Sequence, residues 1–159
     1  MEPTLYSDQS FDSLVIRWMV LEKDCRVEFR IVDPWEVSTI PLPSLRDRDL
    51  HVVAHWPMVQ YLQERYPGEP LLPVDPKIRA QIRQICWLVR RAKNSFVQDA
   101  EDMMGHDNTF VAGDEFTLAD VYAGARLHLL VESGKELPPR AARYYKNLAG
   151  REAFKEAIG

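Results

Sequence analysis

Four histidines, two cysteines and a small group of hydroxyl and carboxyl side chains are the residues of this sequence that could do chemistry. The histidines are His51, His55, His106 and His128. They fall on different predicted elements, so no two of them share one helix face as metal ligands do. The sequence contains no recognisable Ser/His/Asp set, phosphate-binding glycine loop or pair of catalytic carboxylates. Cys25 and Cys86 belong to no Cys-x-x-Cys or Cys/His pattern, and we expect buried free thiols.

The remaining candidate is the hydroxyl and carboxyl group formed by Ser10, Asp12 and Ser13. It stands at the start of a predicted helix over 11–23, in which apolar residues recur with helical spacing. Serine and aspartate at the start of a helix routinely accept hydrogen bonds from its first amides. Ser10 or Asp12 is therefore expected to be the helix N-cap, and any chemical role for Ser10 is an alternative to this structural one.

The first part of the chain, 1–67, alternates strand and helix signals. A short strand is expected at 4–6, and residues 25–31 alternate in polarity, as a half-buried strand does. The prolines and β-branched residues that follow predict a loop. Two short strands then flank the turn at 47–49, and a helix is expected over 56–66 with Pro57 in its first turn. The predicted order is β-α-β-loop-β-β-α.

A proline-rich linker over 68–76 separates this part from a helical remainder, 77–159. Asp75 is expected to cap the next helix, with Pro76 as its first residue. The residues between 77 and 109 are enough for one long helix or two short ones. Thr117 and Asp120 have the spacing of a capping box and predict a helix that ends near residue 131. Short C-terminal helices are expected after the prolines at 138 and 139.

Composition excludes several classes of function. The net charge is -4, and basic residues form no dense run, which disfavours direct binding of nucleic acid. No apolar stretch approaches the ~20 residues that a membrane-spanning helix needs. The N-terminus has no charged-then-apolar leader, so we expect a cytoplasmic protein without a membrane partner. We expect neither a metal nor a cofactor.

Two motifs resemble the glutathione transferase superfamily. The segment Leu42-Pro43-Ser44-Leu45, with its hairpin and a helix ending Glu64-Arg65-Tyr66-Pro67, is similar to the second half of the thioredoxin-like domain, where the proline is cis. The segment 110–120 is similar to the start of the core helix in the C-terminal domain. Within the superfamily, the sequence most resembles the stringent starvation protein A family. The resemblance implies a thioredoxin-like α/β domain followed by a truncated all-α glutathione transferase domain.

The resemblance also implies where glutathione would bind. Ser10 aligns with the family's catalytic serine, and Leu42 and Pro43 with the segment that holds the peptide. The Glu-Ser pair that grips the γ-glutamyl carboxylate is replaced by Ala54 and His55. Because hydrogen bonds to charged groups contribute about 1.5–3 kcal/mol each, losing two lowers affinity on the order of 10²- to 10⁴-fold. Glutathione is thus disfavoured as a ligand, and a weak transferase or thiol-handling enzyme using Ser10 is the alternative function.

A non-catalytic protein-binding module is therefore the preferred hypothesis. Stringent starvation protein A acts with RNA polymerase, so the resemblance implies a regulator that contacts the transcription machinery or another host complex. That family carries a Pro-His-Pro element where this chain has Pro67, Glu69 and Pro70, without the histidine. Trp35, in the predicted loop, either contacts a partner or fills the space left by a missing helix. A homodimer is also possible.

Overall fold

A computed structural model describes residues 1–33, 40–68, 70–105 and 107–159, which form two compact units. The first unit comprises Met1–Pro70 with Glu156–Gly159, and the second comprises Leu71–Lys155. The boundary thus falls after residue 70, within the predicted linker, and the last four residues belong to the first unit rather than to the helical one. Trp35, Glu69 and His106 lie outside the described residues.

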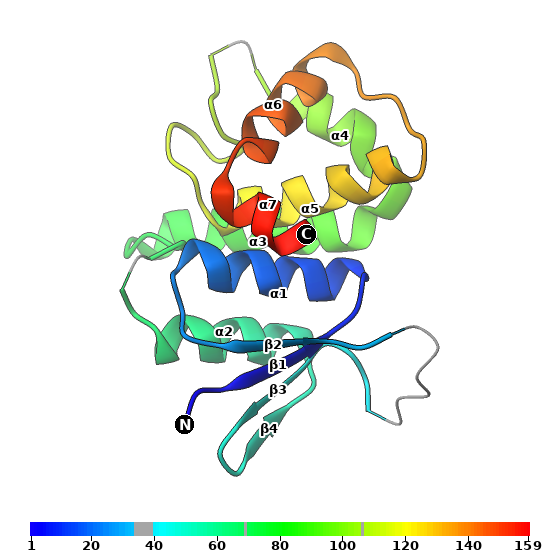
Figure 1. Ribbon diagram of the computed structural model, residues 1–159. Coiled ribbons are helices and arrows are strands. Elements are labelled where there is room, and N and C mark those ends of the chain that lie inside the picture. The colour runs from blue at the N-terminus through cyan, green and yellow to red at the C-terminus, as the bar shows by residue number, and fades with distance from the viewer. Residues whose placement is uncertain (34–39, 69, 106) are drawn as a thin grey trace. The chain divides into compact units, whose positions relative to one another are not determined.

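A four-stranded sheet forms the centre of the first unit (Figure 1). Its strands are β1 (Thr4–Ser7), β2 (Glu28–Ile31), β3 (Ser44–Asp47) and β4 (Leu50–Val52). They lie in the order β2-β1-β3-β4, with β1 parallel to β2 and antiparallel to β3, and β3 antiparallel to β4. This mixed sheet confirms the predicted thioredoxin-like order of elements. The strand predicted over 25–31 is shorter and begins at Glu28, because Cys25 still belongs to the end of the preceding helix, where its amide donates to the Val20 carbonyl oxygen at 3.0 Å.

Helices α1 (Phe11–Glu22) and α2 (His55–Arg65) lie on the same side of this sheet (Figure 1). Leu5 and Leu45 at the sheet centre are fully buried, as is Met58 of α2. Burial in α1 extends well beyond the predicted apolar stripe, because Ile16, Met19 and Val20 are also inaccessible. A helix that is apolar on nearly all sides is a central element of its fold.

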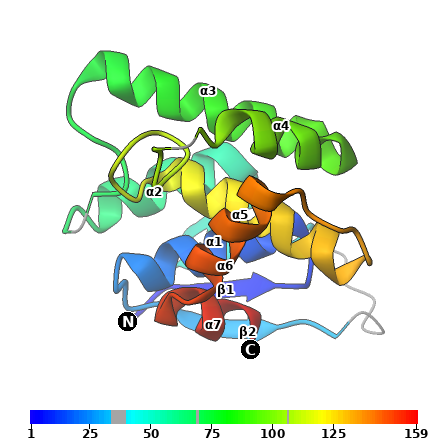
Figure 2. The same ribbon diagram turned by 90° about the horizontal axis from the view of Figure 1, so that it is seen from above.

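The second unit is helical, as expected. Its helices are α3 (Pro76–Ala92), a 3₁₀ turn η1 (Lys93–Ser95), α4 (Phe96–Met103), α5 (Leu118–Glu132) and α6 (Pro139–Ala149). The last helix, α7 (Glu152–Ile158), begins in this unit, and its residues from Glu156 onward belong to the first. Figure 2 shows α5 between α3 and α4 on one side and α6 on the other, and α5 packs against all three. The residues between 77 and 109 therefore form two helices, with a break where Lys93 adopts a φ of 49°.

The predicted capping box starts α5 and is extended by distant partners. Thr117 Oγ1 accepts from the Ala119 amide, and Asp120 Oδ2 accepts from the Thr117 amide at 2.9 Å. The other oxygen of Asp120 accepts from the Val111 amide at 2.9 Å and from the Tyr144 hydroxyl at 2.5 Å. Asp120 is therefore a buried junction of three segments. No helix in the described ranges is long and apolar enough to span a bilayer.

Candidate functional site

Three segments that the sequence linked to ligand binding meet at one end of the sheet (Figure 1). Since β3 runs antiparallel to β1, it begins where β1 ends and where the turn into α1 starts. The Leu42–Pro43 peptide bond is cis and immediately precedes β3. The start of α2 reaches the same place, because His55 Nδ1 lies 3.4 Å from Asp12 Oδ1 in the first turn of α1.

The turn between β1 and α1 is held together by its own polar side chains. Ser10 is the N-cap of α1, and its Oγ accepts from the Ser13 amide at 3.3 Å. Asp8 Oδ1 accepts from the Ser10 amide at 3.0 Å and from the Ser13 hydroxyl at 2.7 Å. The Ser13 hydroxyl accepts in turn from the Asp8 amide at 3.1 Å. Partial burial alone would raise the pKa of Asp8, but the hydrogen bonds from Ser13 and Ser10 lower it.

The buried side chain of Arg17 also holds the turn between β1 and α1 in place. Arg17 Nη1 donates to the Asp8 carbonyl oxygen at 2.5 Å, and Nε donates to the Ala157 carbonyl oxygen at 3.0 Å. The sequence pattern did not single out Asp8 or its contact with Arg17. Asp8 and Ser13 both flank the predicted N-cap, so the sequence did contain a signal that the two could interact. Whether they form a hydrogen bond depends on the path of the turn between them, which the sequence does not give.

His55 faces the protein interior. Its side chain is only 3% exposed, and its ring meets the indole of Trp56 edge to face, with centroids 5.5 Å apart. An imidazole next to a carboxylate is the arrangement of a general base oriented by an acid. Such a base must reach its substrate, and the burial of this ring against Asp12 leaves it almost no accessible surface.

The start of α2 offers few groups to an anionic ligand. Ala54 is the N-cap residue and forms no side-chain capping hydrogen bond. Pro57, in the first turn, has no N–H group to donate. Helix starts bind anions through exposed amides and polar caps, and this one lacks both the cap and one of the amides.

The predicted partner-binding residues within the described ranges are Pro67 and Pro70. Both are exposed and follow α2, whose end is fixed by the Tyr66 hydroxyl donating to the Arg26 carbonyl oxygen at 2.9 Å. They follow the end of α2, whereas His55 is at its start, so the predicted site residues form a ligand group and a separate surface segment.

Comparison with known proteins places the chain among its relatives. No protein-family model matches it. A stringent starvation protein A homologue of Coxiella burnetii is 30% identical, and the match covers 98% of this chain and 90% of the relative. This chain belongs to the stringent starvation protein A family. The alignment spans 189 positions, more than the 159 residues present, so this member of the family lacks residues that the relative has.

Solved structures show that this stringent starvation protein A family member has the glutathione transferase fold. A glutathione transferase of Methylobacterium radiotolerans, in complex with glutathione sulfonate, superposes with a TM-score of 0.86 at 22% identity, covering 99% of this chain and 95% of that one. A glutathione transferase homologue from Burkholderia, with bound glutathione, gives 0.80 at 23% identity, covering 99% and 96%. At these identities the likeness concerns the fold.

Proposed function

We propose that this protein is a non-catalytic binding module that retains the transferase fold as a scaffold for protein recognition in the cytoplasm. The observation that carries the proposal is the position of His55. The residue that stands where the family has a ligand-holding serine is buried against Asp12. Ala54 beside it has no polar side-chain atom, so neither replacement offers a hydrogen bond to a γ-glutamyl carboxylate.

The state of the β1–α1 turn supports the same proposal. The Ser10 hydroxyl oxygen is the N-cap of α1 and accepts from the Ser13 amide, which gives it a structural role in this protein. Asp8 accepts from the Ser10 amide and the Ser13 hydroxyl, and Arg17 donates to the Asp8 carbonyl oxygen. These hydrogen bonds stabilise the turn without requiring a ligand.

The proposed partner is the transcription machinery, which is the role that the family resemblance implies. The exposed segment after α2, with Pro67 and Pro70, is the surface that we assign to the contact. The test is co-elution of the purified protein with bacterial RNA polymerase in size-exclusion chromatography. We expect a stoichiometric complex that Pro70→Asp weakens, whereas Val74→Asp, at an 86% exposed position, is the matched control and leaves it intact. Separate elution of the natural protein and the polymerase would contradict this partner.

A second candidate, a weak glutathione transferase using Ser10, is favoured by one observation. Ser10 is exposed at the N-terminus of α1, and structures with the same fold hold glutathione. The test is turnover of glutathione with a chromogenic electrophile. Turnover that disappears in Ser10→Ala but persists in Ser133→Ala, a hydroxyl at the end of α5, would establish this enzyme and refute the non-catalytic function.

A further inference from the structure

One face of the sheet in the first unit is covered by α1 and α2, and no helix of the described residues covers the other (Figure 1). Side chains alternate between the two faces of a strand, and the buried Leu5 and Leu45 are on the covered face. We call the other surface the open face. The register of the strands gives its residues as Thr4, Tyr6, Glu28, Arg30, Ser44, Arg46 and His51.

Tyr6 stands on the open face with an arginine on each side. It belongs to β1, whereas Arg30 belongs to β2 and Arg46 to β3, the two strands that flank β1. The guanidinium carbons of Arg30 and Arg46 lie 5.9 and 5.8 Å from the centroid of the Tyr6 ring, within the range of a cation–π interaction. Both arginines are exposed. A guanidinium that an aromatic ring already holds loses less conformational freedom when it binds a partner.

The stability of the sheet does not account for these two cations. Opposite charges stabilise a sheet when they lie directly across from one another. Arg46 lies across from Thr4 on one side and His51 on the other, and within the described residues it forms no ion pair. Arg30 is paired with Glu28 of its own strand at 3.1 Å, but both side chains are more than half exposed. Exposed pairs of this kind stabilise a protein little, so Arg30 can exchange Glu28 for another carboxylate.

We propose that the open face binds an extended, acidic segment of a protein partner, with one carboxylate on Arg30 and one on Arg46. The planar guanidinium group matches the geometry of a carboxylate and forms two parallel hydrogen bonds with it. In an extended segment, the side chains of alternate residues point the same way, about 7 Å apart. Acidic residues at alternate positions therefore place one carboxylate on each side of Tyr6.

Nucleic acid fits the open face less well than an acidic segment does. It carries a negative charge at every nucleotide, and proteins bind it with basic grooves that follow several phosphates. The open face offers two arginines together with the carboxylate of Glu28, on a chain whose net charge is -4. A short segment with two carboxylates matches the two cations and brings no further negative charge.

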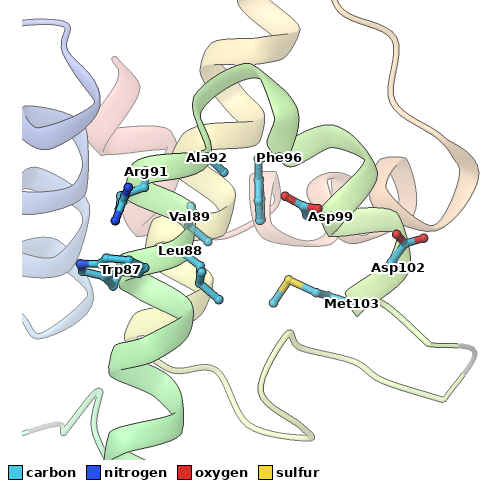
Figure 3. A pocket seen from close by; sticks show the side chains of 9 residues that line it. All are labelled: Trp87, Leu88, Val89, Arg91, Ala92, Phe96, Asp99, Asp102 and Met103. Carbon is cyan, nitrogen blue, oxygen red and sulfur yellow. The ribbon is translucent and has the colours of Figure 1, made fainter.

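The second unit offers a comparable arginine in a less suitable place. A groove of about 630 Å³ lies between α3 and α4, and there Arg91 lies over the Trp87 ring, 4.4 Å from its centroid (Figure 3). Asp99 and Asp102 of α4 line the same groove and would repel a carboxylate. Arg91 is therefore a matched control, because it is an exposed arginine held by an aromatic ring outside the open face.

Fluorescence anisotropy with the full-length protein tests the proposal. The probe is a fluorescein-labelled decapeptide in which glutamate and serine alternate. We expect it to bind with a dissociation constant below about 1 mM and to bind more weakly as salt is added, because salt screens exposed charges. The same peptide with glutamine in place of glutamate is expected not to bind. No polymerase is present, so the result is independent of the partner proposed above.

Charge reversal locates the binding surface. Arg30→Glu and Arg46→Glu are each expected to weaken binding about tenfold, because each removes one charge-assisted contact and adds a repulsive one. Arg91→Glu makes the same change in net charge and is expected to leave binding unchanged. The double variant Arg30→Glu with Arg46→Glu is expected to bind a decapeptide of alternating lysine and serine, which the natural protein does not. Gained binding of this kind also shows that the double variant is folded.

Three results would overturn the proposal. The first is that the natural protein does not bind the glutamate peptide at millimolar concentration. The second is that Arg91→Glu weakens binding as much as Arg46→Glu does, which would show a general effect of net charge. The third is that single-stranded oligouridine of the same length binds more tightly than the peptide and is lost in Arg30→Glu and Arg46→Glu, which would make the open face a nucleic-acid site.

Discussion

Around His55, the backbone of the family's ligand site is retained, while the side chains that would bind the ligand are replaced. The sequence was sufficient to identify the replaced residues, because the motif around Pro43 fixes their alignment. It was not sufficient to place the imidazole, which is buried 3.4 Å from Asp12. That contact joins two helix starts far apart in the chain, and only the fold brings them together. The Asp8–Ser13 pair was missed for the same reason.

We predict that the Cys25 thiol reacts slowly with alkylating reagents. Burial, partly offset by Lys23, raises its pKa to about 11, so at pH 8 less of it is thiolate than in an ordinary cysteine. Alkylation by iodoacetamide, followed by mass spectrometry, should be slower than for the same residue in urea and should accelerate as the pH approaches that pKa. Cys86, which is fully buried, should react more slowly still. Equal rates for Cys25 in folded and unfolded protein would contradict this prediction.

Asp8 is predicted to contribute to stability in a pH-dependent way. Its pKa is lowered in the folded protein, where Ser13 and Ser10 donate to the carboxylate against the opposing effect of burial. A lowered pKa stabilises the fold above the unfolded value of 3.8, and this contribution is lost as the pH falls below it. Urea unfolding between pH 3 and pH 7 should show a shallower acid decline in Asp8→Asn.

Ser13→Ala is the matched variant for this test, because it removes one donor and leaves the carboxylate in place. It should reduce the acid dependence in the same direction as Asp8→Asn, by a smaller amount. If both variants kept the natural slope, Asp8 would not be the group responsible.

At the scale of elements, local signals predicted the bounds of α1 and α2 and the end of α5 to within one residue. Asp75 with Pro76, and Thr117 with Asp120, begin α3 and α5 as expected, because capping depends on neighbours within a few residues. The sequence did not predict whether a break separates α3 from α4. It occurs at Lys93, a residue type that gives no local signal for a positive φ.

Tyr144 tests how far the capping box depends on tertiary structure. Its hydroxyl donates to the buried Asp120 carboxylate, so Tyr144→Phe removes this one hydrogen bond and keeps the ring. We expect the free energy of unfolding to fall by about 1.5–3 kcal/mol, the usual range for hydrogen bonds to charged groups. Urea denaturation at neutral pH measures it. Tyr145→Phe is the control at a half-buried hydroxyl that bonds His128, and should cost less. A loss below that of the control would show that the box is stable without Tyr144.

At the scale of the whole molecule, resemblance predicted the two-part organisation and the all-helical second part. It did not predict that Glu156–Gly159 would belong to the first unit. One long-range contact that joins them to this unit is the hydrogen bond from the buried Arg17 to the Ala157 carbonyl oxygen, which no periodicity in either segment encodes.

Truncation tests the role of these last residues. Removing residues 156–159 leaves Arg17 Nε without its acceptor and exposes surface that Ala157 covers. An unsatisfied buried charged group costs more than about 1–3 kcal/mol, so we expect a clear fall in melting temperature. Deleting Gly159 alone is the control and should leave it unchanged. Equal melting temperatures for the two truncations would show that the tail contributes no stability.

Calorimetric titration of the purified protein with reduced glutathione tests the central claim most directly, because the proposed function rests on a lost ligand site. The buried His55 and the uncapped start of α2 predict no binding at millimolar glutathione. His55→Ser, checked for folding by circular dichroism, shows whether that residue is the obstacle. Binding by the natural protein with a dissociation constant below about 1 mM, or roughly 4 kcal/mol, would contradict the account.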